Sequence, residues 1–119
     1  MVRVLVIDDD DSIREIIRIM LKEFEVLEAS NAIEGIKLFQ TMNPDIVLMD
    51  ISMPGIDGVE ATKEILKINP KAIVLGITAF ARSRGKELIE AGAKGIIEKP
   101  FTRKSLKEII GKCLLKYRV

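Results

Sequence analysis

The residues of this chain that could do chemistry are carboxylates in two distant places. Asp8 and Asp9 follow an apolar run that begins at Val2, and Asp50 follows the apolar residues 46–49. The second run is short and shows no polar alternation, which is typical of a strand buried on both faces of a parallel sheet. Open α/β sheets bind ligands at the carboxyl ends of such strands. Taken alone, Asp50 could equally be a turn residue.

Two further polar side chains follow apolar runs. Thr78 comes directly after residues 72–77, and Lys99 follows a short run around Ile96. Singly, these residues suggest an ordinary strand end and a solvated lysine, and the acids of residues 8–11 could simply cap a helix. Jointly, an acid pair, an acid, a hydroxyl and a lysine follow four predicted strands. That set could hold a divalent cation and the oxygens of a transferring phosphoryl group.

The composition restricts the kind of site. Histidine is absent, which excludes Ser-His-Asp catalysis and histidine-ligated metals, and Cys113 is the single cysteine. A metal must therefore be held by oxygen, which favours Mg²⁺, Mn²⁺ or Ca²⁺. Clustered carboxylates repel one another unless a cation neutralises them. We expect Asp8, Asp9 and Asp50 to bind Mg²⁺, with Mn²⁺ as a substitute, and Asp50 to be a nucleophile that forms an aspartyl-phosphate.

The elements that position these residues alternate along the chain. Its 119 residues suit one domain, residues 1–119. Strands are predicted at residues 2–7, 24–29, 46–49, 72–77 and around 96–97, each followed by a helix. Asp11 or Ser12 would cap the first helix, Ser30 or Asn31 the second, and Thr102 or Ser105 would open the last.

This alternation predicts an α/β fold with right-handed crossovers and helices on both faces of a parallel sheet. The second and fifth strands carry charges, which suits the edges of a sheet. We therefore predict a doubly wound five-stranded sheet of order 2-1-3-4-5, flanked by five helices. That order places the ends of the first and third strands side by side.

Bulk properties argue against some partners. The net charge of +1 gives no general attraction to nucleic acid or membranes. No apolar run approaches the roughly 20 residues of a membrane span, and the N-terminus does not look like a signal peptide, so we expect a cytoplasmic protein. Sparse Asn and Gln with abundant Ile, Lys and Glu suggest a thermophilic source.

Over essentially its whole length the chain resembles the response-regulator receiver domains of two-component signalling, of the chemotaxis or sporulation single-domain type. The resemblance lies in the motifs VIDDD, DIVLMDISMPGIDG, GITA and AGAKGIIEKPF. It implies a flavodoxin-like receiver fold, with Asp50 as phosphoacceptor and Asp9 binding Mg²⁺ directly, Asp8 mainly through water. The Ser52 carbonyl would be a further ligand, Thr78 and Lys99 would contact the phosphoryl group, and Lys99-Pro100 would be a cis peptide.

The resemblance also implies partners. A sensor histidine kinase or histidine phosphotransfer protein would donate the phosphoryl group, and a downstream protein would read the face of the fourth helix, fifth strand and fifth helix. The chain would not be a conventional enzyme, although it would catalyse its own phosphorylation and dephosphorylation. Ile13, Ile16, Pro100 and Phe101 are predicted to form the kinase-docking patch. The simpler alternative is that the first helix covers the sheet and leaves a few isoleucines exposed.

Three positions bear on the behaviour of this particular chain. Ile96 stands where many receivers carry Tyr or Phe, so the usual aromatic switch is in doubt. Ser52 and Phe80 should flank the phosphoryl group and set its lifetime. Gly85 lies within a shortened segment, residues 78–92, which predicts a short or mobile fourth helix.

Several alternatives stay open. A haloacid-dehalogenase-type phosphatase generally needs a second Asp two positions after the first, where this chain has Ser52. A flavodoxin-like cofactor carrier needs a phosphate loop where this chain has four acids. A phosphorylation-dead binding module usually lacks Asp50 or Lys99. Within the family, a receiver cut from a longer regulator with a DNA-binding or enzymatic output competes with a single-domain protein. Ile96 slightly favours a phosphorelay over chemotaxis.

Overall fold

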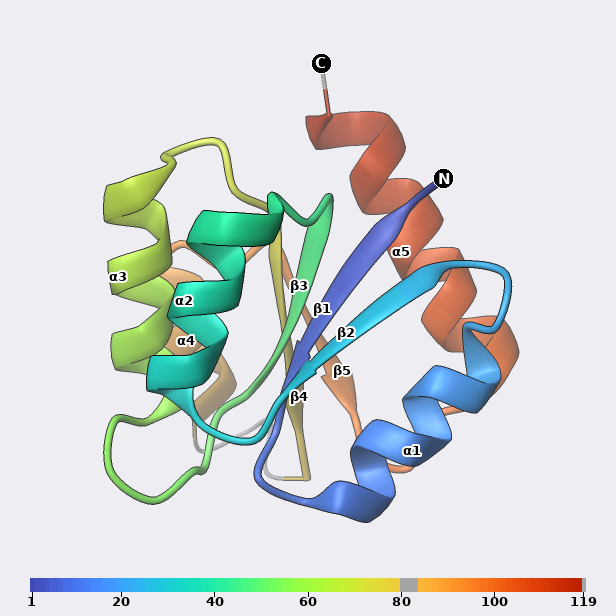
Figure 1. Cartoon of the computed structure of the whole chain (residues 1–119), viewed down its shortest axis with the longest axis horizontal. Helices are drawn as coiled ribbons and strands as arrows, with labels where there is room; N and C mark the ends of the chain where they lie inside the picture. The colour runs from blue at the N-terminus through green and yellow to red at the C-terminus, as the bar shows by residue number, and fades with distance from the viewer. Residues whose placement is uncertain (80–83, 119) are drawn as a thin grey trace.

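The computed structural model describes residues 1–79 and 84–118. Strands and helices alternate along the chain, as predicted (Figure 1). The elements in order are β1 (Arg3–Ile7), α1 (Asp11–Met20), β2 (Glu25–Ala29), α2 (Ala32–Met42), β3 (Ile46–Asp50), α3 (Gly58–Ile68), β4 (Val74–Thr78), α4 (Lys86–Glu90), β5 (Gly95–Glu98) and α5 (Arg103–Tyr117).

The sheet is parallel and has the order β2-β1-β3-β4-β5, which confirms the predicted topology. Helices α1 and α5 cover one face, and α2, α3 and α4 cover the other (Figure 1). All five strands point the same way, so their carboxyl ends lie together at the lower edge of the sheet in that view. The residues that follow β1 and end β3 are neighbours because these two strands pair directly.

Two hydrophobic cores explain why the central strands lack polar alternation. Successive strand residues point to opposite faces. Leu5 and Ile7 of β1 pack with α2 and α3, whereas Val4 and Val6 pack with α1 and α5. Because both faces are covered by helices, the central strands have no polar residue except at their ends, where Arg3, Asp50 and Thr78 lie.

The helix N-termini follow ordinary capping chemistry, with one correction to the sequence prediction. The cap of α1 is Asp10, not Asp11 or Ser12, because Asp10 has extended backbone and its Oδ1 accepts a hydrogen bond from the Ser12 amide at 2.8 Å. Asn31 caps α2 and Thr102 caps α5, both as predicted.

Within the described residues 84–118, regular α-helix of the fourth helix covers Lys86–Glu90, and Gly92 shortly after it has a positive φ of 115°. The predicted irregularity around Gly85 agrees with the start of regular helix at Lys86. The parts of that prediction that concern residues 80–83, and the role assigned to Phe80, lie outside the described residues.

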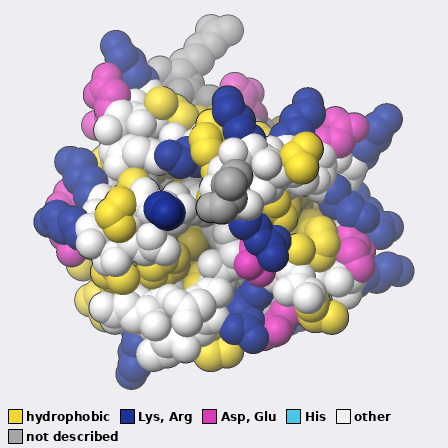
Figure 2. Space-filling view, turned by 90° about the horizontal axis from the view of Figure 1, so that it is seen from above, with side chains coloured by type: hydrophobic (Ala, Val, Ile, Leu, Met, Phe, Trp, Pro, Cys, Tyr) yellow, Lys and Arg dark blue, Asp and Glu magenta, His cyan; other side chains and the backbone are white. Residues whose placement is uncertain are grey.

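The surface mixes charges of both signs. Figure 2 views the end of the molecule where the two termini lie, and basic side chains stand around its rim with acidic side chains between them. This distribution fits the net charge of +1. Among the helices that the structure describes, each is too short or too polar to cross a membrane.

Candidate acidic site

Three carboxylates converge at the carboxyl ends of β1 and β3. Asp8 and Asp9 directly follow β1, and Asp50 is the last residue of β3. One carboxylate oxygen from each residue lies within 4.8 Å of the others. Asp8 and Asp50 are buried, with 1% and 6% of their surface exposed, whereas Asp9 faces solvent. The predicted juxtaposition of these residues is therefore present.

Asp8 is held by its neighbours, but one of its carboxylate oxygens has no hydrogen bond. Its amide donates to the Ala29 carbonyl at 3.1 Å, and its Oδ1 accepts from the Asp10 amide at 2.9 Å. Across residues 1–79 and 84–118, its Oδ2 is the single buried side-chain oxygen or nitrogen without a hydrogen-bond partner. A buried oxygen of this kind ordinarily has a partner, and a cation or its bound water would satisfy it. The residues present thus fit a hard divalent cation.

Lys99 lies beside both buried acids. Its Nζ is 3.6 Å from Oδ2 of Asp8 and 3.9 Å from Oδ1 of Asp50. Both distances are those of ion pairs and exceed hydrogen-bond length. The Lys99 amide donates to the carbonyl of Thr78 at 2.9 Å, which continues the ladder between β4 and β5. The Lys99-Pro100 peptide is cis.

The electrostatics of the cluster favour a bound proton or cation. Burial raises the pKa of Asp50 to about 7, helped by the charge of Asp8 and opposed by Lys99 and the Ser52 amide. Burial also raises the pKa of Asp8, against the lowering effects of the Asp10 amide and Lys99. Near neutral pH the cluster therefore retains a proton unless a cation replaces it.

The other predicted site residues lie at the same edge. Thr78 is buried and is the last residue of β4, one position beyond the residue that pairs with Asp50. Ser52 is exposed in the loop after β3. That loop returns to its own strand, since the Gly58 amide donates to the Ile51 carbonyl at 2.9 Å. A Cβ at Gly58 would lie 2.1 Å from the backbone oxygen of Asp50, so α3 can start there only with glycine.

Two arginines near this edge were not singled out from the sequence. Arg84 binds Asp57, the cap of α3, at 2.8 Å and Glu87 at the same distance. Arg14 of α1 contacts the backbone carbonyl of Asp8 at 2.5 Å. The sequence offered only weak signals for either, because charged residues on helices are usually solvated.

The four predicted docking residues line one hollow. Ile13, Ile16, Pro100 and Phe101, together with Lys99, surround a space of about 280 Å³ beside the acidic cluster. Ile16 is 43% exposed, whereas Ile17 of the same helix and Leu21, which caps its C-terminus, are fully buried. The first helix therefore covers the sheet and also presents apolar surface next to the site.

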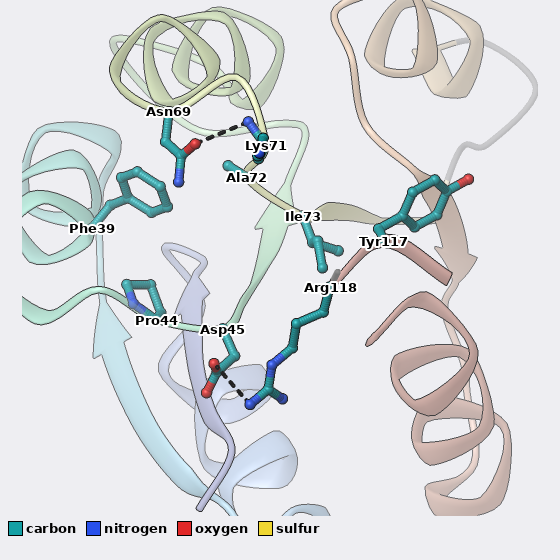
Figure 3. A pocket seen from close by; sticks show the side chains of 9 residues that line it. All are labelled: Phe39, Pro44, Asp45, Asn69, Lys71, Ala72, Ile73, Tyr117 and Arg118. Carbon is teal, nitrogen blue, oxygen red and sulfur yellow. Dashed lines mark hydrogen bonds and ion pairs between the residues drawn. The ribbon is translucent and has the colours of Figure 1, made fainter. Parts of the chain in front are cut away.

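A second hollow, of about 270 Å³, lies at the opposite ends of the strands (Figure 3). Phe39 and Pro44 stand on one side of it, and Arg118 reaches across to Asp45 at 3.7 Å. It contains none of the predicted site residues. The acidic cluster is therefore the stronger candidate for the functional site, because buried carboxylates and an oxygen without a hydrogen bond occur together there.

The fold and this cluster define a doubly wound α/β domain with an acidic site at the carboxyl edge of its sheet. Residues 4–111 match the response regulator receiver domain family. The chain belongs to that family, whose members act in two-component signalling and are not classical enzymes.

Individual relatives agree with this assignment. Chemotaxis protein CheY of Halobacterium salinarum is 37% identical over 115 residues, covering 94% of this chain and 96% of that protein. Response regulator GacA of Pseudomonas viridiflava is 38% identical over 104 residues, covering 83% of this chain and 49% of that protein. A CheY-like receiver domain protein of Methanospirillum hungatei has a TM-score of 0.93 at 27% identity, covering 99% and 97% of the two chains.

Proposed function

We propose that this chain is a phosphoacceptor response regulator that takes a phosphoryl group onto Asp50. The observation that carries the proposal is the acidic cluster, with Lys99 beside two buried carboxylates and one oxygen of Asp8 unsatisfied. The donor would be a phosphohistidine of a sensor kinase or phosphotransfer protein. Because the chain has no histidine of its own, it can only be the acceptor.

In the proposed transfer, a carboxylate oxygen of Asp50 attacks phosphorus and forms an O–P bond. The P–N bond of the donor breaks, and its electron pair stays on the imidazole nitrogen. The nucleophile must be ionised, and the neighbouring Lys99 lowers the pKa of Asp50 toward that state. Asp8, Asp9, Asp50 and the carbonyl of Ser52 would hold Mg²⁺, which neutralises the charge on the transferring phosphoryl oxygens when it is bound.

The signal would leave through β4, α4, β5 and α5. The added negative charge would draw Thr78 and Lys99 toward Asp50 and bias this face between two arrangements. Ile96 is half-buried against the core that α4 helps to form. A Cβ at Gly76 would meet Leu88 at 2.1 Å and Ile96 at 2.9 Å, so these side chains fill the space over that glycine. Such packing supports a switch based on movement of α4 instead of rotation of an aromatic ring.

The donor would dock at the hollow formed by Ile13, Ile16, Pro100 and Phe101, which adjoins the acceptor. We expect Ile13→Ala or Phe101→Ala to slow transfer from the cognate kinase while leaving phosphorylation by acetyl phosphate unchanged. Ile33→Ala is the matched control because Ile33 is 70% exposed on α2, on the other face of the sheet. Equal transfer rates for all variants would exclude this docking surface.

The decisive chemical test is incubation with acetyl phosphate, with and without Mg²⁺, followed by intact-mass measurement. One added phosphoryl group that requires Mg²⁺ and is absent in Asp50→Asn supports the proposal. Modification that persists in Asp50→Asn would overturn it. The phosphatase alternative is less well supported because the position of its acid/base residue is held by Ser52, which cannot transfer protons in that way.

The output class has two candidates. Similarity to a chemotaxis protein supports a regulator that signals by binding a downstream target in the cytoplasm, whereas Ile96 supports onward transfer in a phosphorelay. The match to part of GacA keeps open a receiver that belongs to a longer regulator. Incubation of the phosphorylated chain with a histidine phosphotransfer protein separates the first two, because only a relay component would pass its phosphoryl group on.

A further inference from the structure

Arg14 is a largely buried arginine in the first part of α1, and its contacts join the segment before that helix to strand β2. Only 12% of its side chain is exposed. Its Nη1 donates to the backbone carbonyl of Asp8 at 2.5 Å, its Nε pairs with Glu28 at 3.3 Å, and its Nη2 pairs with Asp11. Arginine is rarely buried unless it is paired. This one is buried against the chain segment that carries two of the three acids.

The contact to the Asp8 carbonyl constrains more than Asp8. A peptide unit is planar, so the carbonyl of Asp8 and the amide and Cα of Asp9 form one rigid group. Holding that carbonyl fixes where the side chain of Asp9 begins. The amide of Asp8 is already bound to Ala29, and its Oδ1 to the Asp10 amide. Arg14 therefore completes the restraint of the segment and leaves Oδ2 of Asp8 as the group without a hydrogen bond.

Arg14 is itself held by the edge strand β2. Glu28 bridges two arginines, with Oε1 3.3 Å from Arg14 and Oε2 3.0 Å from Arg18. The next residue, Ala29, accepts the hydrogen bond from the Asp8 amide. Two adjacent residues of β2 thus restrain Asp8, one directly and one through Arg14. A guanidinium presents its donors in a fixed planar fork, so it can hold a carbonyl and two carboxylates together, which an ammonium cannot do with the same geometry.

We propose that Arg14 is a positioning residue for the divalent-cation site, where it orients the Asp8-Asp9 peptide so that the two carboxylates are preorganised around the ion. This rests on the proposed function, because it presumes that the cluster binds Mg²⁺. Partners that orient metal ligands typically contribute about 10-fold to 100-fold in metal affinity. Since Arg14 acts through the backbone and not on a ligand atom, we expect the lower end of that range.

The experiment measures Mn²⁺ binding to the unphosphorylated full chain by electron paramagnetic resonance, with Mg²⁺ as competitor. Arg14→Ala should raise the dissociation constant about tenfold. Arg14→Lys should also weaken Mn²⁺ binding, because lysine keeps the positive charge but lacks the planar set of guanidinium donors. If Arg14 acted through its charge alone, the dissociation constant of Arg14→Lys would equal that of the wild type. Glu28→Gln, which removes the anchor of Arg14, should weaken binding less than Arg14→Ala does.

Arg18→Ala is the matched control, since it breaks the other ion pair of Glu28 without touching the Asp8 carbonyl, and it should bind Mn²⁺ like the wild type. The melting temperature of each variant identifies general destabilisation, and Arg14→Lys and Glu28→Gln carry the test if Arg14→Ala does not fold. Wild-type affinity in Arg14→Lys and Glu28→Gln, or equal weakening in Arg18→Ala, would overturn the role of Arg14 alone. A wild-type chain that binds neither ion would overturn the proposed cation site as well.

Discussion

The ammonium group of Lys99 lies 3.9 Å from Oδ1 of Asp50. These residues come from different strands, because Asp50 ends β3 and Lys99 follows β5. The interaction opposes the two effects that favour a neutral Asp50, its burial and the nearby charge of Asp8. Lys99 therefore increases the fraction of Asp50 that is ionised near neutral pH.

Replacing Lys99 with methionine should raise the pKa of Asp50 further above about 7. Methionine keeps the side-chain length and removes the charge. Titration of carboxyl carbons by nuclear magnetic resonance would measure the shift, and Lys107→Met is the control because Lys107 pairs with Glu23 away from the site. An unchanged or lower pKa of Asp50 in Lys99→Met would show that the ion pair has no electrostatic effect.

The metal-free protein should lose stability as the pH rises from about 4 to about 7. Asp50 has a folded-state pKa of about 7 and an ordinary value of 3.8 when unfolded. The contribution of protonated Asp50 to the free energy of unfolding is therefore fully present below pH 3.8 and is lost as the pH rises through 7. Asp50→Asn should flatten this slope and stabilise the protein at pH 8 by roughly 2 kcal/mol, since one pKa unit corresponds to about 1.4 kcal/mol. Urea unfolding at several pH values, with chelator present, measures both effects.

Mg²⁺ should stabilise the folded protein at pH 8. Binding to the native state alone adds about 1.4 kcal/mol when the free ion is at ten times its dissociation constant. The gain should largely disappear in Asp9→Asn, because Asp9 is a predicted direct ligand that is exposed and therefore costs little stability itself. Thermal melts with Mg²⁺ and with equal ionic strength of NaCl separate specific binding from screening; the same gain in both salts would argue against a site.

Gly58→Ala should destabilise the protein by about 2–3 kcal/mol, in the range known for overpacked sites. The added Cβ would collide with the backbone oxygen of Asp50 at 2.1 Å, and neither backbone can easily move. Gly111→Ala is a matched control, because nothing lies within 4 Å of the new Cβ on the exposed side of α5. That control should be stabilising by up to about 1 kcal/mol through helix propensity. Chemical denaturation should show a lower free energy of unfolding for Gly58→Ala and a higher one for Gly111→Ala.

Breaking the ion pair between Arg84 and Asp57 should loosen α4 more than it destabilises the whole protein. Both side chains are about one-third exposed, so Arg84→Ala should lower global stability by no more than about 1 kcal/mol. Burial raises the pKa of Asp57, but the Arg84 hydrogen bond and the Glu60 amide outweigh it and lower the net value. The stability that the Arg84–Asp57 pair contributes to the folded protein is thus present above pH 3.8 and is lost on acidification below that value.

Hydrogen exchange provides the specific readout for this pair. In Arg84→Ala, amides of α4 should exchange faster, whereas amides of α2 should not change. Uniform protection in both helices would mean that Arg84 does not restrain α4.

The sequence by itself determined the order of strands and helices and which polar residues end the strands. Apolar runs and helical spacing are local patterns, and they predicted the elements. The charges on the second and fifth strands then predicted the sheet order, which brings the ends of the strands, with Asp8, Asp50, Thr78 and Lys99, to one edge. The sequence did not identify the N-cap residue of α1, because several neighbouring polar side chains could accept hydrogen bonds from the first amides of that helix. Backbone geometry selects among them, and Asp10 caps α1 where Asp11 or Ser12 was predicted.

Only the tertiary structure decided the electrostatics of the site and the contacts of Arg14. The raised pKa of Asp50 and the unsatisfied Oδ2 of Asp8 depend on burial, which results from packing of segments far apart in the chain. The sequence shows Arg14 as one charged residue on a helix. Its ion pair with Glu28 exists because β2 pairs with β1 and lies beside α1. Such relations depend on three-dimensional distance, which spacing along the chain does not specify.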